Sequence, residues 1–555
     1  MRWFSRYWCV LVIPAAWGVL EAWQDAATSP YWLYFDPSYS YLLNSLNLLK
    51  GMTPLDIFHP GTSLQELCLC VVRILNIGRP VPDIVHRVLI DPEFYLGMVH
   101  SAMAFMVVVS LALLGWYVHQ ATKDKVLACL SQLPSVVMLP YFLYVTPDPF
   151  LILLMNVFFL CFFALFFDGN RRKDWCWVIL WGVVCGCGLV AKFIFLPLVV
   201  VPLIVLRWPL RGVFLAACVV ASVVFTWPIM PEYHRLWLKA MNLVTHTGIH
   251  GQGAVGFIDI PRYLEIWRNI CAWHPWIITG LVAAIGVCAW SLFRKGFGRR
   301  EVFLAAAIAG VLAQFGIVAR YYLYVDHYLV PGLALGALLW VLVYARQGAA
   351  SVLGRGAVLV MFILLVGQSL SQAFTARVAA LDFRKDVFAF NDMLQKKYPA
   401  CAVVGAYAAY RMPYAFLWSN RSSLAVSREL EALYPGHYYM DEFSRDVRDF
   451  EGRVYTNDLA ARKGCVLFVA STPTYCSDGP YTLKALEDSK FQHAYLLEQT
   501  AERQVDALFE AAVKAYEQGD IAKAVALALK SREFNYQPRG KVDYFLMMAY
   551  GRLKH

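Results

Sequence analysis

Two aspartates stand next to apolar segments, where a carboxylate is unfavourable unless it is exposed, paired or used in chemistry. Asp36 lies in Asp36-Pro37-Ser38-Tyr39, just after the first apolar segment, and Asp148 lies in Thr146-Pro147-Asp148-Pro149 between two later ones. Each has a structural alternative, because Asp before Pro often starts a turn and Asp148 can cap a helix that begins at Pro149. From their common location near one membrane surface we predict catalytic roles for both, with Asp36 as the general base.

Cationic and aromatic residues also lie within or next to apolar segments. Lys192 interrupts an apolar stretch from Trp175 to Leu206, and its side chain either extends to the membrane surface or binds a phosphate. The run from Arg320 to Tyr328 is either an aromatic belt at the membrane interface or a binding surface. We predict that Lys192, Arg320 and His327 are ligands of a donor phosphate.

Two further stretches have residue types that suit substrate binding. Tyr39 and His59 follow Asp36, and a later stretch reads His246-Thr247-Gly248-Ile249-His250-Gly251-Gln252-Gly253. Two histidines four residues apart can ligate a metal on a helix, but the glycines disfavour a helix and favour a flexible substrate loop. We therefore predict no metal site and no cofactor, and leave the use of a divalent metal open. The predicted substrate-binding residues are Tyr39, His59, His246, His250 and Tyr328.

These residue types suit the transfer of a sugar from a lipid phosphate. Such a reaction passes through an oxocarbenium-like transition state while a phosphate departs. It needs a carboxylate to deprotonate the acceptor hydroxyl and cations to stabilise the leaving group. In this hypothesis Asp36 supplies the carboxylate, and Lys192, Arg320 and His327 supply the positive charge.

The composition indicates a membrane protein. Hydrophobic residues make up 59% of the 555 residues and charged ones only 16%, which lies outside the range of soluble globular domains. The net charge of +10 is not gathered in a long basic run, so we predict no nucleic-acid partner. Most of the cysteines lie in apolar runs. Cys465 and Cys476 are able to form a disulfide if their part of the chain faces an oxidising compartment.

Eleven apolar segments are near the roughly 20-residue length that a bilayer requires. If the N-terminus is inside, the short inner loops are all basic and the short outer turns contain mainly Lys192 and Arg320, as the positive-inside rule demands. The odd number of segments then places the chain from about residue 375 onward outside. The segments lie near residues 7–23, 93–118, 126–145, 150–167, 174–191, 193–206, 212–229, 272–293, 301–318, 328–345 and 357–374.

The sequence thus predicts a polytopic α-helical membrane domain over residues 1–375, followed by two smaller parts on the outer side. Within the membrane domain, residues 24–92 and 230–271 form outer loops, and short apolar runs at 41–49 and 64–75 suggest interfacial helices. Residues 376–500 alternate strand-like runs, at Cys401–Gly405 and Cys465–Ala470, with a helical run at Tyr481–Ser489, which predicts a soluble α/β domain. Residues 501–555 predict a helical tail that loosely resembles one tetratricopeptide unit. The alternatives for the tail are a plain helical hairpin and a site for a protein partner.

Four short motifs occur in order along residues 1–375. They are Asp36-Pro37-Ser38-Tyr39 with His59-Pro60-Gly61-Thr62-Ser63-Leu64, then Asp148-Pro149-Phe150-Leu151, Gly188-Leu189-Val190-Ala191-Lys192 and Tyr328-Leu329-Val330-Pro331. In order and sidedness they resemble the motifs of the GT-C class of polyprenyl-phosphate-sugar-dependent glycosyltransferases, within it the protein O-mannosyltransferase and aminoarabinose-transferase group.

The resemblance implies an inverting glycosyltransferase at the outer face of a bacterial cytoplasmic membrane. Its partners would be a polyprenyl-phosphate sugar as donor and a lipid, glycan or protein as acceptor. The sequence departs from the group in two ways: Pro37 follows Asp36 where the group often has a second acid, and the Trp-Trp-Asp-Tyr-Gly and DxD signatures of the oligosaccharyltransferase branch are absent. One alternative is a lipid or solute transporter or flippase with Asp148 and Lys192 lining the path. Another is a scaffold whose tail recruits partners.

Overall fold

The structure is a computed structural model of the whole chain. It describes residues 2–27, 31, 38–55, 57, 61–167, 174–248, 251, 253–295, 298–321, 326–346, 352–405, 416, 424–440, 447–455, 464–470, 481–499 and 511–534.

The chain divides into two compact units. The first, called here the membrane unit, consists of Met1–Ser29, Gly51–Arg79 and Glu93–Ala379. The second, called here the sheet unit, consists of Pro30–Lys50, Pro80–Pro92 and Ala380–His555. Residues 24–92 therefore contribute to both units, and Tyr39 belongs to the sheet unit.

The membrane unit consists of helices joined by loops in its described residues, with one isolated bridge between His246 and Val255. Its helices are α1 (Arg2–Ala27), α3 (Thr62–Leu75), α5 (Pro92–Thr122), α6 (Lys125–Leu130), α7 (Leu133–Val136), η1 (Leu139–Tyr141), α8 (Pro147–Phe167), α9 (Asp174–Ala191), η2 (Phe193–Val199), α10 (Val200–Val205), α11 (Trp208–Thr226), η3 (Trp227–Glu232), α12 (Tyr233–Thr245), α13 (Ile260–Trp273), α14 (Pro275–Lys295), α15 (Arg299–Tyr321), η5 (Asp326–Leu329), α16 (Val330–Arg346) and the first part of α17 (Val352–Lys397).

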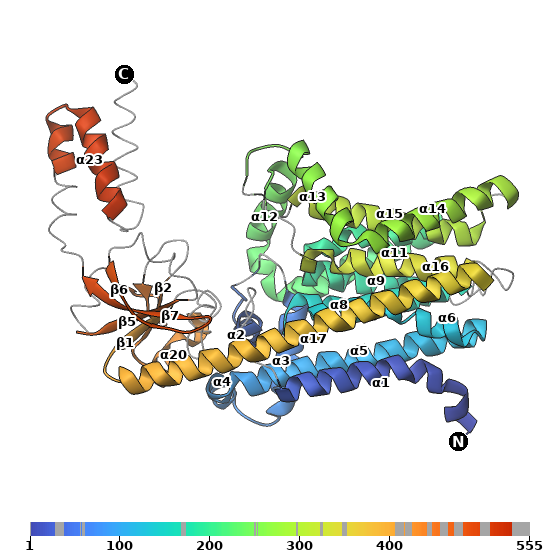
Figure 1. Cartoon of the computed structure of the whole chain (residues 1–555), viewed down its shortest axis with the longest axis horizontal. Helices are drawn as coiled ribbons and strands as arrows, with labels where there is room; N and C mark the ends of the chain where they lie inside the picture. Colours follow the sequence, from blue (N-terminus) through green and yellow to red (C-terminus); the bar gives the residue numbers. More distant parts are fainter. Residues whose placement is uncertain are drawn as a thin grey trace. The chain divides into compact units, whose positions relative to one another are not determined.

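Among the described residues, eight helices are long and apolar enough to cross a membrane (Figure 1). They are α5, α8, α9, α14, α15, α16, α17 and the continuous helical stretch Trp208–Thr245, which includes both α11 and α12. The other three expected segments coincide with shorter apolar helices at Val10–Ala22, Lys125–Tyr141 and Phe193–Val205. These helices confirm a multi-pass α-helical membrane protein, because a backbone in lipid must satisfy its hydrogen bonds within the segment.

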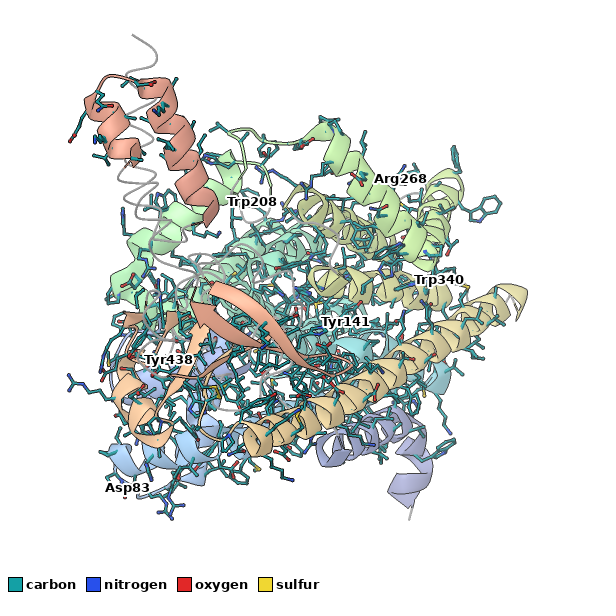
Figure 2. The ribbon with its side chains drawn as sticks, turned by 60° about the vertical axis from the view of Figure 1, so that its left-hand side comes forward. Asp83, Tyr141, Trp208, Arg268, Trp340 and Tyr438 are labelled. Carbon is teal, nitrogen blue, oxygen red and sulfur yellow. A yellow bond between two sulfur atoms is a disulfide. The ribbon has the colours of Figure 1, made fainter. Side chains whose placement is uncertain are left out.

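Small residues let the membrane helices approach closely. A Cβ atom on Gly182 of α9 would lie 2.6 Å from the Phe214 carbonyl oxygen of α11, and Gly186 one turn later makes a similar approach to Cys218. This Gly-xxx-Gly spacing is typical of packed membrane helices. Trp340 of α16 (Figure 2) adds a polar link, since its Nε1 donates to the Trp276 carbonyl oxygen of α14 at 3.1 Å.

Buried polar side chains also join the helices. Asn156 of α8 donates to Ser110 of α5 at 3.0 Å and accepts from Ser135 of α7. Arg377 of α17 donates to Glu21 of α1 at 2.9 Å, and both are at most 1% exposed. The His100 Nε2 atom of α5 lies 3.9 Å from the second Glu21 oxygen. Burial of ionised groups is tolerated here because they are paired.

The sheet unit has a seven-stranded mixed sheet in the order β4-β3-β2-β1-β5-β7-β6. The central strand β1 is parallel to β2 and β5, with Val404 opposite Tyr438 and Phe468, and the outer pairs are antiparallel. Tyr438 (Figure 2) packs its ring against Tyr455 at 5.0 Å, and the side chains of β5 are all buried. The elements are α2 (Ser38–Leu49), α4 (Val81–Ile90), β1 (Ala402–Gly405), η6 (Leu424–Val426), α20 (Ser427–Leu433), β2 (His437–Met440), β3 (Val447–Arg448), β4 (Val454–Tyr455), β5 (Val466–Ala470), β6 (Tyr481–Asp488) and β7 (His493–Gln499).

The expected C-terminal α/β domain is confirmed, but three details of the sequence interpretation are wrong. Tyr481–Asp488 is strand β6 instead of a helix, because pairing along β7 outweighs the local helix preference of residues such as Leu483, Lys484 and Ala485. Cys465 is bonded to Cys401 instead of Cys476, since parallel pairing of β1 with β5 brings the Cα atoms of Cys401 and Cys465 within 4.7 Å. Helix α2 is buried on almost all sides, unlike a helix lying on a membrane surface.

The described part of the tail is a helical hairpin. A helix over 511–517 and α23 (Ile521–Phe534) bury Ala512, Ala515, Ala524 and Ala528 against each other. The turn between them uses Gly519 with a positive φ of 81°, and the Asp520 side chain accepts from the Lys523 backbone N–H. The two helices form their own small core.

Candidate active site

A buried ion pair joins α8 to the end of α9. The Lys192 Nζ atom donates to the Asp148 Oδ1 atom at 2.9 Å and lies 3.2 Å from Oδ2, and the two residues are 1% and 2% exposed. Asp148 is in the first turn of α8, where proline is tolerated on both sides and a negative charge faces the positive end of the helix dipole. Helix α9 ends at Ala191, and Lys192 is extended, with φ −161° and ψ 129°.

An aromatic ring completes the surroundings of the ammonium group. The Lys192 Nζ atom lies 4.5 Å from the centroid of the Tyr328 ring, in the cation–π range. Tyr328 is in η5, just before α16, and its carbonyl oxygen accepts from the buried Gln314 side chain of α15 at 3.2 Å. Four segments of the membrane unit therefore meet at Lys192: the start of α8, the end of α9, α15 and η5.

This geometry decides between the alternatives for Lys192 and Asp148. The lysine side chain is held in the protein and does not extend to a surface, and the Asp148 carboxylate faces the ammonium group instead of capping a helix. An ammonium group has three N–H donors, of which the two carboxylate oxygens use at most two. The cluster is thus a buried ion pair without net charge, whose ammonium group retains an N–H donor that could be directed to an anion in surroundings of low dielectric constant.

Arg320 lies at the end of α15 and holds the loop between α12 and α13. Its guanidinium donates to three backbone carbonyl oxygens, those of Leu243 at 2.8 Å, Val244 at 2.7 Å and Phe257 at 2.5 Å. The Phe257 ring lies 4.3 Å from the guanidinium carbon. Because the last carbonyls of α12 have no partner within their helix, the arginine caps that helix. Three of the Arg320 donors are thus directed to the loop.

The predicted glycine-rich loop is a turn closed by backbone hydrogen bonds. His246 pairs with Val255 in an isolated bridge, and Thr247 N–H donates to the Ala254 carbonyl at 2.9 Å. Gly248 has φ +79°, a conformation that a residue with a side chain rarely adopts. The His246 Nδ1 atom lies 2.9 Å from the Thr245 hydroxyl.

The remaining predicted residues divide into three groups. His327 is next to the cluster, with its ring centroid 4.2 Å from that of Tyr328. Tyr39 is fully buried in the sheet unit, where its ring packs edge-to-face on Phe416 at 5.0 Å. Asp36, His59 and His250 lie outside the described residues.

Two polar residues of the membrane unit were not predicted. Gln314 is a buried amide in an apolar helix, and this polar interruption was the signal in the sequence. Glu66 lies on α3, whose Ser63 hydroxyl donates to the Cys187 carbonyl oxygen at 3.5 Å, shortly before Lys192. Burial raises the pKa of the Glu66 carboxyl to about 7. In the sequence Glu66 looks like an ordinary polar residue of an amphipathic helix. Within the described part of the chain, no three His, Cys, Asp or Glu side chains are grouped to hold a metal.

Comparisons with known proteins find solved structures of similar architecture. No family model matches the chain, and no curated protein matches it. The crystal structure of ArnT from Cupriavidus metallidurans bound to undecaprenyl phosphate aligns with a TM-score of 0.49 and 12% sequence identity, over 88% of this chain and 97% of that chain. The apo structure of the same protein aligns with a TM-score of 0.47 and 12% identity, over 85% and 94%. At these values no residue role is transferred, so the proposals below rest on the residues of this chain.

Proposed function

We propose that the chain is an inverting glycosyltransferase that transfers a sugar from a polyprenyl-phosphate donor to a hydroxyl of a lipid, glycan or protein. The observation that carries the proposal is the buried Lys192 ammonium, fixed by Asp148 and Tyr328 at the ends of apolar helices. A lipid phosphate needs this combination, because its chain lies among membrane helices while its charged head needs a cation.

In the proposed reaction, the Asp36 carboxylate takes the proton of the acceptor hydroxyl as its oxygen attacks the anomeric carbon of the sugar. The bond between that carbon and the phosphate oxygen breaks, and its electron pair leaves with the phosphate. Attack opposite the leaving group inverts the configuration. Lys192 stabilises the charge that develops on the phosphate, with His327 as a second ligand.

The other residues have supporting roles in this proposal. Asp148 orients the Lys192 ammonium and neutralises it in the absence of substrate. Arg320 holds the outer loop, and the turn that contains His246 faces the substrates. We place the reaction at the outer surface of a bacterial cytoplasmic membrane, on the basis of the basic inner loops in the sequence.

The transporter alternative would place Asp148 and Lys192 along a path near the middle of the bilayer, between broken helices. The two residues stand instead at the start of α8 and directly after α9. Because Asp148 and Lys192 lie at helix ends, they favour a site that opens at a membrane surface over a path through the middle of the bilayer.

The test is an assay of the purified full chain with labelled polyprenyl-phosphate sugars and a membrane-lipid extract as acceptor, measuring release of polyprenyl phosphate. We expect Asp36→Asn to reduce the rate about 10²- to 10⁴-fold, the usual contribution of a general base. Asp148→Asn combined with Lys192→Met, which removes the cation without leaving a buried charge, should lose about 10²-fold or more.

The matched control is Asp83→Asn, which removes an exposed carboxylate of the same type on α4. Its rate should equal that of the unmodified protein. Full activity of folded Asp36→Asn would rule out the base, full activity of the double variant would rule out the phosphate site, and protein-dependent lipid flipping without sugar transfer would support the transporter.

A further inference from the structure

A charged hollow lies in the membrane unit, away from the Lys192 cluster. Its volume is about 220 Å³, and side chains from five segments line it in the described part of the chain. The residues that matter here are Leu165, Asp174, Leu206, Arg207, Arg299 and Phe303.

The hollow is at the opposite ends of the helices that form the Lys192 cluster. Asp148 is in the first turn of α8, whereas Leu165 is near its last residue, 17 residues later by number. At 1.5 Å per residue this is about 25 Å, close to the thickness of the hydrocarbon core. Asp174 likewise begins α9, and Lys192 follows its end. The hollow therefore faces the other surface of the membrane.

Two arginines from different helices give the hollow its charge. Arg207 directly precedes α11, and Arg299 is the first residue of α15. Arg299 is held in place, since it donates to the Leu165 carbonyl oxygen and its guanidinium carbon lies 5.9 Å from the Phe303 ring centroid. Asp174 is the single acid among the lining residues, so the hollow has a net charge of +1.

The rest of the lining is apolar, which favours an anion that carries an acyl chain over a small soluble anion. Leu165, Leu206 and Phe303 form a wall that suits an acyl chain, while the guanidinium groups suit the oxygens of a phosphate. Trp208 next to Arg207 is 80% exposed (Figure 2), a typical location for tryptophan at the level of lipid headgroups. Basic hollows between membrane helices are known sites for acidic lipid headgroups.

We propose that this hollow, called here the basic hollow, binds the phosphate headgroup of an anionic phospholipid from the leaflet opposite the Lys192 cluster. Arg207 and Arg299 contact the phosphate, and the apolar wall contacts the first part of an acyl chain. The bound lipid would join the ends of α8, α9, α11 and α15. This inference does not depend on the proposed transferase activity.

The test measures lipid binding to the full-length protein in detergent by native mass spectrometry. The probes are dioleoyl phosphatidylglycerol, dioleoyl phosphatidylcholine with the same chains, and inorganic phosphate. The unmodified protein should retain one phosphatidylglycerol in preference to phosphatidylcholine. Arg207→Gln with Arg299→Gln should weaken phosphatidylglycerol binding about tenfold or more, because both charged hydrogen-bond donors to the phosphate are removed.

Two comparisons make the result specific. Arg235→Gln with Arg300→Gln removes two exposed positive charges that do not line the basic hollow, and should leave binding unchanged. Asp174→Asn removes the opposing carboxylate and should strengthen binding. Equal binding by the two double variants, or equal retention of both lipids, would overturn the proposal. Displacement of phosphatidylglycerol by millimolar inorganic phosphate would overturn the lipid assignment, since it would indicate a soluble phosphate ligand.

Discussion

At the scale of single residues, the Lys192–Asp148 pair is the feature with the largest energetic consequence. Both side chains are almost completely buried, and each ion is tolerated because the other neutralises it. Removing one partner leaves a buried charge, whereas replacing both leaves a neutral core. The pair therefore predicts a strongly non-additive response to mutation.

We expect Asp148→Asn to lower the free energy of unfolding by about 3–5 kcal/mol. Asp148→Asn with Lys192→Met should be less destabilised than Asp148→Asn alone, because no unpaired ammonium remains. The free energies of unfolding of both variants can be measured in detergent, with circular dichroism as the signal. If Asp148→Asn with Lys192→Met is destabilised as much as Asp148→Asn alone, or more, the charges do not stabilise each other.

Glu66 gives a prediction for pH. Its pKa in the folded protein is about 7, above the ordinary 4.5, so the folded state retains this proton to higher pH than the unfolded state. The contribution of the protonated Glu66 carboxyl to the free energy of unfolding is complete below pH 4.5 and is lost as the pH rises from 4.5 towards 7. Glu66→Gln should therefore have a higher Tm than the unmodified protein at pH 8, and the difference should vanish near pH 4.5.

The comparison for Glu66 is Glu517→Gln, which changes an exposed glutamate in the tail hairpin. This variant should follow the unmodified protein at every pH. A Tm difference for Glu66→Gln that is the same at pH 4.5 and pH 8 would contradict the raised pKa.

Asp148 and Lys192 could be selected from the sequence because a charge beside apolar runs needs a reason. Their pairing could not be predicted, since they are 44 residues apart and each had a sufficient local explanation. Arg320 was selected for the same reason, but its donors are directed to three carbonyl oxygens that no side-chain pattern reveals. The types of the charged residues were informative, and their partners depended on the fold.

At the scale of elements, Arg320 connects α15 to the turn after α12. Arg320→Lys retains the charge but cannot donate to three carbonyls from one planar group. We expect amide hydrogen exchange in residues 245–256 to become about tenfold faster or more, as hydrogen bonds to a charged group are lost. Amide hydrogen exchange of the variant and of the unmodified protein, measured by mass spectrometry in detergent, tests this prediction.

The control for that experiment is Arg268→Lys, an exposed position on the neighbouring α13 (Figure 2). It should leave exchange in the turn unchanged. If Arg320→Lys exchanges like the control, the guanidinium contacts do not hold the loop.

Long apolar helices were the elements that the sequence predicted best, because about 20 apolar residues in a row leave few alternatives. The strand β6 was mistaken for a helix, since its residues favour helices and only pairing with β7 makes them a strand. The partner of Cys465 was wrong for a related reason, because pairing of β1 with β5 brings Cys401 to it. In both cases the deciding contact comes from a distant part of the chain.

At the scale of the whole molecule, the sequence predicts which ends of the membrane helices face which compartment. Arg235 on α12 and Arg300 on α15 are both exposed, and the basic inner loops place Arg300 inside and Arg235 outside. Arg235→Cys should react with a membrane-impermeant maleimide in right-side-out vesicles, and Arg300→Cys only in inverted vesicles. The unmodified protein gives the background labelling of the native cysteines. Labelling of Arg235→Cys only in inverted vesicles, and of Arg300→Cys in right-side-out vesicles, would contradict the predicted topology.

The contact between Glu21 and Arg377 has a consequence for how the protein is made. The two residues are 356 positions apart, on the first helix and on α17, the last of the long apolar helices that the structure describes. During synthesis, α1 enters the membrane long before Arg377 exists, so the Glu21 carboxylate must wait for the cation that neutralises it. A chain that stops before Val352 contains Glu21 and its neighbour His100 without the Arg377 guanidinium. Synthesis beyond Arg377 supplies that guanidinium, so chains that contain α17 differ physically from chains that are interrupted before it.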